Sequence, residues 1–120
     1  MNNTLERRKH KRAQYGIPLQ VQPVSPSKSG NVFEVQDRYL GAGGVNISEG
    51  GLNFELGESL QPGSILKVTF KIRPQDSVEH ETYAKVMWVK KTNHGVQFLM
   101  LEENTLRKIR GFIETGEPAN

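Results

Sequence analysis

An unbroken alternation of apolar and polar residues runs through Leu66-Lys67-Val68-Thr69-Phe70-Lys71-Ile72-Arg73. A period of two turns one set of side chains toward a core and the other toward water, which is typical of a half-buried β-strand. Shorter stretches with the same period occur at residues 17–22, 33–36, 52–56 and 96–100. Residues 82–90 are apolar on both faces, which predicts a central strand with Trp88 in the core.

Turn-forming residues separate these stretches, at positions 26–30, 41–44, 62–63, 74–77 and 93–95. Short strands with such turns, and no alternation of strands with helices, predict an all-β sandwich or small barrel. The period changes near the end, where Leu106, Ile109 and Ile113 lie at i, i+3 and i+7. That spacing predicts a helix over residues 102–115 that packs on the barrel, followed by a frayed tail at 116–120.

The composition restricts the class of protein. A chain of 120 residues suits a single domain. The absence of cysteine excludes disulfides, thiol catalysis and cysteine-ligated metals. No apolar run is long enough to span a membrane and the N-terminus does not resemble a secretory signal, so we expect a cytoplasmic protein without membrane insertion.

The net charge of +3 is unevenly distributed. Residues 1–12 contain five basic residues against Glu6 alone, a charge of +4, and residues 13–120 contain eleven basic and twelve acidic residues, a charge of −1. Such a cluster fits a phosphate ligand, nucleic acid or a lipid surface, and it equally fits a solvated tail. We expect residues 1–13 to form a flexible basic arm.

Two short motifs contain the residue types that bind anions. The first is Arg8-Lys9-His10-Lys11-Arg12, preceded by Arg7. Guanidinium groups match phosphate oxygens and the O6/N7 edge of guanine. The second is Asn46-Ile47-Ser48-Glu49-Gly50-Gly51, which predicts an amide and a hydroxyl on the outer face of a strand before a glycine turn. Taken alone, the first also fits any basic tail and the second any ordinary turn.

Together the two motifs resemble the signature of the PilZ domain family, Arg-x-x-x-Arg followed by Asp/Asn-x-Ser-x-x-Gly. Val86-Met87-Trp88-Val89 and Gly95-Val96-Gln97-Phe98 are similar to late strands of that family, and the resemblance covers all but the extreme termini. It implies a six-stranded antiparallel β-barrel over residues 14–101, closed by the helix at 102–115. It also implies a stand-alone receptor for cyclic di-GMP, a bacterial second messenger, which binds on the outer surface of the barrel.

The resemblance implies six ligand-binding residues: Arg7, Arg8, Arg12, Asn46, Ser48 and Gly51. By motif position, Arg8 and Arg12 would contact phosphate and guanine, Asn46 and Ser48 would supply polar contacts, and Gly51 would keep the turn tight. In proteins similar to this one, an arginine at position 7 accompanies an intercalated ligand dimer. Arg38 is more simply a surface residue than a ligand contact.

Other functions have less support from the residues. A nucleic-acid-binding small β-barrel with a basic arm is the main alternative, although the body is acidic and no stacking aromatic is evident on an outer strand. A module that has lost its ligand is a second. The scattered His10, His80 and His94 predict no metal site, and no catalytic set predicts an enzyme. We therefore expect an adaptor, monomeric or weakly dimeric, whose arm changes conformation on ligand binding and signals to a protein effector.

Overall fold

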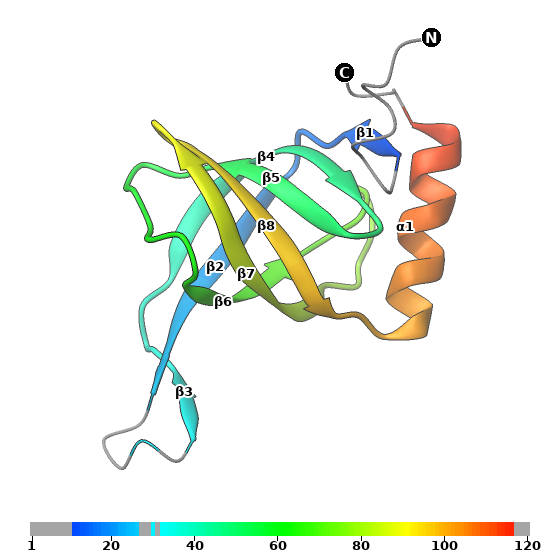
Figure 1. Ribbon diagram of the computed structural model, residues 1–120. Helices are drawn as coiled ribbons and strands as arrows, with labels where there is room; N and C mark the ends of the chain where they lie inside the picture. Colours follow the sequence, from blue (N-terminus) through cyan, green and yellow to red (C-terminus); the bar gives the residue numbers. More distant parts are fainter. Residues whose placement is uncertain (1–10, 27–29, 31, 117–120) are drawn as a thin grey trace, which may run out of the picture.

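The computed structural model describes residues 11–26, 30 and 32–116. It contains eight strands and one helix (Figure 1). The elements are β1 (Arg12–Gln14), β2 (Pro18–Pro26), β3 (Phe33–Val35), β4 (Leu40–Ser48), β5 (Gly51–Glu55), β6 (Ile65–Phe70), β7 (His80–Lys90), β8 (Asn93–Met100) and α1 (Glu103–Thr115). No described helix has the length and apolar character that crossing a membrane requires.

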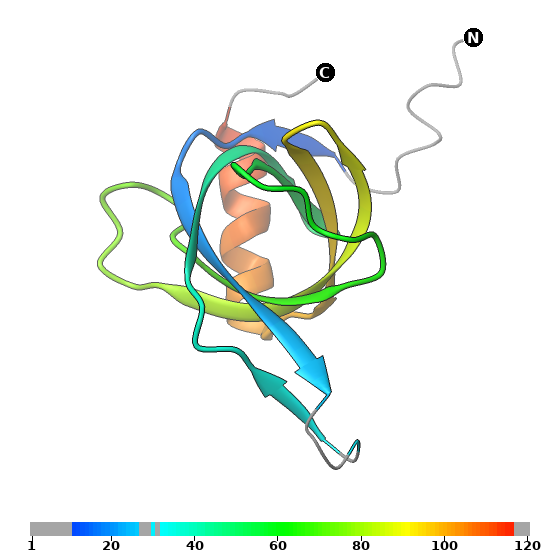
Figure 2. The same ribbon diagram turned by 90° about the vertical axis from the view of Figure 1, so that its left-hand side faces the viewer.

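Six strands form a closed antiparallel barrel in the order β4-β5-β8-β7-β6-β2, and pairing of β2 with β4 completes the ring. Figure 2 looks along the barrel and shows this closure. β1 adds to β4 and β3 adds to β2 as two outer strands. The predicted six-stranded barrel with a C-terminal helix is therefore confirmed.

The barrel interior follows the alternation in the sequence. Leu66, Val68 and Phe70 of β6 are buried, while the residues between them are partly exposed. α1 lies across one open end of the barrel, where Ile109 is fully buried in the core (Figures 1 and 2). The apolar stripe on the helix therefore closes the core at that end.

Tyr15 joins the helix to the sheet. Its ring meets Phe112 of α1 edge-on, with the ring centroids 6.0 Å apart, and its hydroxyl donates to the carbonyl of Lys71. Burial, with a smaller contribution from Asp76, raises the pKa of the Tyr15 phenol far above its ordinary value. The phenol is therefore a neutral donor across the physiological range.

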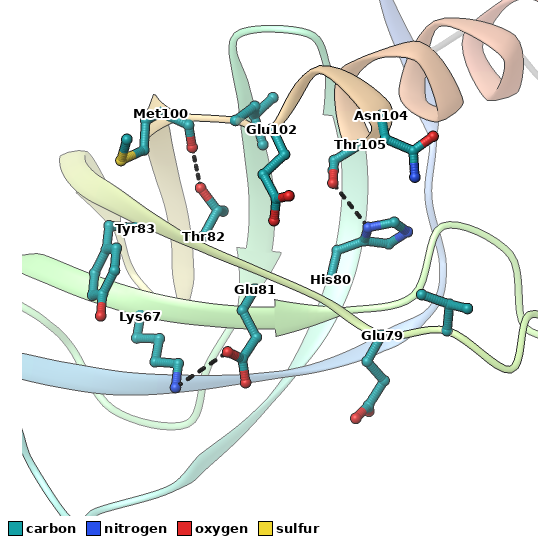
Figure 3. A pocket seen from close by; sticks show the side chains of 12 residues that line it. Lys67, Glu79, His80, Glu81, Thr82, Tyr83, Met100, Glu102, Asn104 and Thr105 are labelled. Atoms are coloured by element: carbon teal, nitrogen blue, oxygen red, sulfur yellow. Dashed lines mark hydrogen bonds and ion pairs between the residues drawn. The ribbon is translucent and has the colours of Figure 1, made fainter.

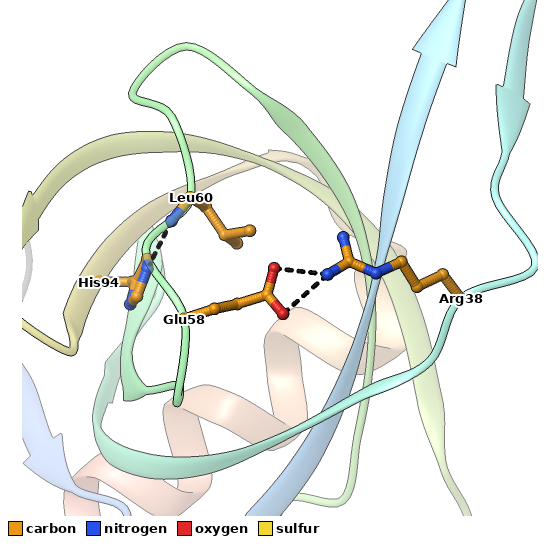
Figure 4. A network of polar contacts seen from close by, with 4 residues as sticks. All are labelled: Arg38, Glu58, Leu60 and His94. Carbon is orange, nitrogen blue, oxygen red and sulfur yellow. Dashed lines mark hydrogen bonds and ion pairs between the residues drawn. The ribbon is translucent and has the colours of Figure 1, made fainter.

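Two histidines, His80 and His94, are buried. His80 begins β7, and its Nδ1 lies 2.9 Å from the Thr105 hydroxyl at the start of α1 (Figure 3). Burial and then the charge of Lys108 lower its pKa, although Asp76 and Glu102 oppose this. His94 stacks on Phe54, and its Nε2 accepts a hydrogen bond of 3.1 Å from the amide of Leu60 (Figure 4). Both imidazoles thus serve as polar links inside the fold.

Other differences from the sequence-based expectations concern segment boundaries. Residues 41–44 are not a loop but lie within β4, where Gly43 faces Pro18 and Glu55. Arg12 and Ala13, expected in the flexible arm, lie in β1 and pair with Ser48 and Ile47. The sheet therefore begins two residues earlier than the barrel boundary at residue 14.

Candidate functional site

Pairing of β1 with β4 brings the two sequence motifs together. Arg12 lies opposite Ser48, and Gln14 lies opposite Asn46. The Nη1 atom of Arg12 donates a hydrogen bond of 2.7 Å to the Oδ1 atom of Asn46. One arginine of the basic motif is thus held at the polar turn that follows it by more than thirty residues.

Ser48 organises this turn from inside. Its side chain is 2% exposed, and its hydroxyl oxygen accepts hydrogen bonds of 3.1 Å from the amides of both Gly50 and Gly51. The hydroxyl also lies within 3.4 Å of the carbonyl oxygen of Gly51, to which it donates. Ser48 was expected to present its hydroxyl on the outer surface, but the structure buries it because the turn needs an internal acceptor.

Gly51 is required by the close approach of a neighbouring strand. A Cβ atom at this position would lie 2.2 Å from the carbonyl oxygen of Val96 in β8. That distance is far below van der Waals contact, so any side chain would push β5 away from β8. The glycine therefore fixes the position of the turn on the barrel.

The one carboxylate of the turn is neutralised by the helix. Glu49 Oε1 lies 2.9 Å from Nε of Arg110 in α1. An unpaired carboxylate here would repel an anionic ligand. The ion pair instead offsets the charge of Glu49 at the turn beside which Arg12 lies.

The surface continues from Asn46 across three further strands. Asn46 pairs with Asn53, Asn53 with Gly95, and Gly95 with Trp88. Cross-strand partners point to the same side of a sheet, so these residues form one row on the outer face of the barrel. We call the row Gln14, Asn46, Asn53, Gly95 and Trp88 the outer row.

Trp88 lies at the end of the outer row and is 45% exposed. A Cβ atom on Gly95 would lie 2.2 Å from its indole ring, so the ring rests against the glycine backbone. The expectation that Trp88 belongs to the core is therefore wrong. The cause is a register shift between Val86 and Trp88, which inserts Met87 and turns the indole outward.

Asn53 is a further residue of the outer row that the sequence did not single out. The Oδ1 atom of Asn53 is buried and has no hydrogen-bond partner within the described part of the chain. Such an orphaned acceptor is unusual in a folded protein, and ligand sites are among the places where it occurs. The polar alternation in residues 52–56 was the one signal that placed Asn53 outward.

A separate cavity lies away from this surface. It measures about 740 Å³ and lies between the start of β7 and the connection from β8 to α1 (Figure 3). Three carboxylates line it, from Glu79, Glu81 and Glu102, and Lys67 is paired with Glu81 at 3.4 Å. These charges disfavour an anionic ligand, so the cavity is a less suitable anion site than the surface around Arg12.

Not every predicted residue can be placed. Arg7, Arg8 and His10 lie outside the described residues. Arg38 is half exposed and forms an ion pair with Glu58, with 2.6 Å between Nη2 and Oε2 (Figure 4). Across residues 11–26, 30 and 32–116, no group of three or more His, Asp or Glu side chains is arranged to hold a metal ion.

Comparison with protein families places the chain. The model of the PilZ domain matches residues 6–115, so the protein belongs to the PilZ domain family. No curated protein matches the chain.

Solved structures share the fold. The Bacillus subtilis inhibitor of motility MotI/DgrA superposes with a TM-score of 0.69 at 18% identity, and the match covers 90% of this chain but 50% of that one. The chain thus spans about half the length of that protein. The PilZ domain of Escherichia coli YcgR with c-di-GMP has a TM-score of 0.59 at 15% identity, and the match covers 91% of this chain and 90% of that one. The PilZ domain of CeSA from a cellulose-synthesizing bacterium has a TM-score of 0.58 at 11% identity, and the match covers 86% of this chain and 94% of that one.

Substitution of Gly51 tests the packing of the turn. We expect Gly51→Ala to reduce the free energy of unfolding by about 1–3 kcal/mol, because its Cβ atom overlaps the Val96 carbonyl. Gly43→Ala is the matched control, since a Cβ atom there meets nothing within 4 Å. Urea denaturation of both variants measures the difference. Equal midpoints for the two would contradict the close approach.

Proposed function

We propose that this protein is a receptor for cyclic di-GMP that binds the ligand on the outer surface around Arg12 and the Asn46–Gly51 turn. The observation that carries the proposal is the contact of Arg12 with Asn46 beside the turn made by Ser48. Cyclic di-GMP has two phosphates and two guanines, which guanidinium groups and short polar side chains recognise. Membership of the PilZ family and the fold shared with the YcgR domain support the same ligand.

The residues around the turn have different roles in the proposed site. Arg12 contacts a phosphate or a guanine edge, and Asn46 orients its guanidinium through the 2.7 Å hydrogen bond. Ser48 and Gly51 shape the backbone that lies under the ligand, since the serine hydroxyl is committed to the turn. Arg8 and Arg7 supply further cations from the segment before β1. We assign Arg7 to an intercalated ligand dimer, which predicts two ligands per chain.

The outer row extends this site toward Trp88. The exposed indole offers a flat apolar face on which a guanine base can stack. Asn53 lies between Trp88 and Asn46 in the row, and its unpaired Oδ1 can accept from the exocyclic amine of guanine once the amide turns outward. One base thus sits near Trp88 and the phosphates near Arg12.

The protein does no chemistry on its ligand in this proposal and acts as a cytoplasmic adaptor. Binding fixes the segment that carries Arg7 and Arg8 against the barrel, and the resulting surface is read by a protein effector. A ligand shifts such an equilibrium only through its different affinity for the two states. The contacts of Arg7 and Arg8 with the ligand supply that difference.

Removal of the Arg12 guanidinium is the most direct test. We expect Arg12→Ala to weaken binding of cyclic di-GMP about 10- to 100-fold, because a charge-assisted hydrogen bond contributes about 1.5–3 kcal/mol. Arg38→Ala is the control, since it removes a more exposed arginine that pairs with Glu58. Isothermal titration gives affinity and stoichiometry together. Unchanged affinity in Arg12→Ala would disprove the site, and one ligand per chain would disprove the ligand dimer.

Trp88 provides a second test, because it is the one tryptophan in the sequence. Cyclic di-GMP should quench its fluorescence as the base stacks on the indole. Trp88→Ala should weaken binding about 5- to 100-fold, whereas Trp88→Phe should retain most of the affinity. Met87→Ala, at the neighbouring exposed position, should bind like the parent. Full affinity in Trp88→Ala would remove the indole from the site.

The role of the segment before β1 is tested by NMR. We expect the heteronuclear NOE values of residues 1–11 to rise when cyclic di-GMP is added, because Arg7 and Arg8 become attached to a bound ligand. Residues of β7 serve as the internal reference. Equal values with and without ligand would exclude the proposed change.

The same titrations separate this proposal from a nucleic-acid-binding barrel. The exposed Trp88 supplies one of the stacking groups that such a barrel needs. A single-stranded oligonucleotide that binds as tightly as cyclic di-GMP, with a strong dependence on salt, would favour the nucleic-acid function. Competition by GTP at equal affinity would indicate unspecific phosphate binding.

A further inference from the structure

Gly95 of β8 lies against the side chain of Trp88 in the outer row. The two residues are cross-strand partners in the pairing of β8 with β7. A Cβ atom on Gly95 would lie 2.2 Å from both Cε2 and Nε1 of the indole and 2.7 Å from Cζ2. These atoms belong to both rings of the indole. The side chain of Trp88 therefore fills the space that any larger residue at position 95 would need.

The burial of the two residues indicates how the indole is seated. Gly95 is buried although it has no side chain and belongs to a row on the outer face of the barrel. Trp88 covers it and is itself 45% exposed. A ring that rests on the sheet with one face leaves its other face open to solvent, which matches this division. In the proposed function, a guanine base stacks on that open face.

The strand beneath the indole is held from inside the barrel. His94 precedes Gly95, is fully buried and stacks on Phe54 with the ring centroids 5.4 Å apart. Its Nδ1 donates a hydrogen bond of 2.8 Å to the carbonyl of Thr92, and its Nε2 accepts one of 3.1 Å from the amide of Leu60. Because β8 cannot retreat here without losing these bonds, an added side chain at position 95 would move the indole and not the strand.

Gly95 differs from Gly51 in the group that must give way to a side chain. At Gly51 the obstacle is the backbone carbonyl of Val96, so a Cβ atom separates β5 from β8. At Gly95 the obstacle is a side chain with two rotatable bonds, which can lift from the sheet. Substitution of Gly95 therefore changes the orientation of Trp88 more than it changes the fold.

We propose that Gly95 is a positioning residue of the ligand site, which seats the Trp88 indole with one face on β8 and the other toward the ligand before the ligand binds. This inference rests on the proposed function, because the seating of the indole matters for binding only if a base stacks on it. A preset ring loses less side-chain freedom on binding. A larger residue at position 95 would weaken binding without removing a ligand contact.

The seating of the indole is tested first in the ligand-free chain by NMR. The Hα protons of Gly95 should resonate well upfield of those of Gly41, because they lie under the face of an aromatic ring. Gly41 is a strand glycine whose Cβ position has no group within 4 Å. Trp88→Ala should remove the upfield shift. Gly95 protons without that shift in the parent chain would overturn the seating.

Titration with cyclic di-GMP then tests the role of Gly95 in binding. Gly95→Ala should weaken binding about fivefold or more, because the stacking surface is displaced, whereas Gly41→Ala should bind like the parent. The chain with both Gly95→Ala and Trp88→Ala should match Trp88→Ala alone, since the glycine acts only through the indole.

Two results of these titrations would overturn the positioning role. One is an affinity of Gly95→Ala equal to that of the parent. The other is a double variant in which the losses of the two single variants add, because Gly95 would then act independently of Trp88. Absence of binding by the parent chain would instead reject the proposed function itself, and this role with it.

Discussion

The hydrogen bonding of one edge of β4 determines most of this structure. Residues 40–43 of that edge pair with β2 and close the barrel, and residues 46–48 pair with β1. Between these two pairings, the backbone amide of Tyr15 donates to the carbonyl of Val45, and the backbone amide of Gly44 donates to the carbonyl of Ile17. The same edge therefore forms the ring of strands and brings Arg12 to the Asn46–Gly51 turn. Barrel closure and the geometry of the candidate site thus depend on the same strand edge.

Under the proposed function, this arrangement prepares the site before cyclic di-GMP binds. Asn46 already holds the guanidinium of Arg12, and Ser48 already satisfies the amides of the turn. Less side-chain freedom is then lost on binding, so more of the interaction energy becomes affinity. The helix contributes as well, because Arg110 pairs with Glu49 and offsets its charge.

The sequence was sufficient for the regular parts of the fold. The alternation at residues 66–72 predicted β6, and the stripe of Leu106, Ile109 and Ile113 predicted α1. Trp88 was assigned to the core because residues 82–90 were interpreted as apolar on both faces, whereas the extra residue Met87 turns the indole to the surface. The burial of Ser48 and His94 depends on hydrogen bonds to the Gly51 amide and the Leu60 amide, and no local pattern encodes such contacts. The candidate site stays a prediction, which rests on two motifs that are distant in sequence.

The extra residue in β7 has a consequence for how this chain can vary. The residues after Val86 in β7 face inward or outward as they do because Met87 is an extra residue relative to β8. Loss or gain of a single residue here exchanges the inside of the barrel for its outside, whereas a change of side chain alters one contact. The spacing between Val86 and Gly95 therefore decides which side chains of β7 face outward, and an insertion or deletion there is expected to disrupt the outer face more than a substitution does.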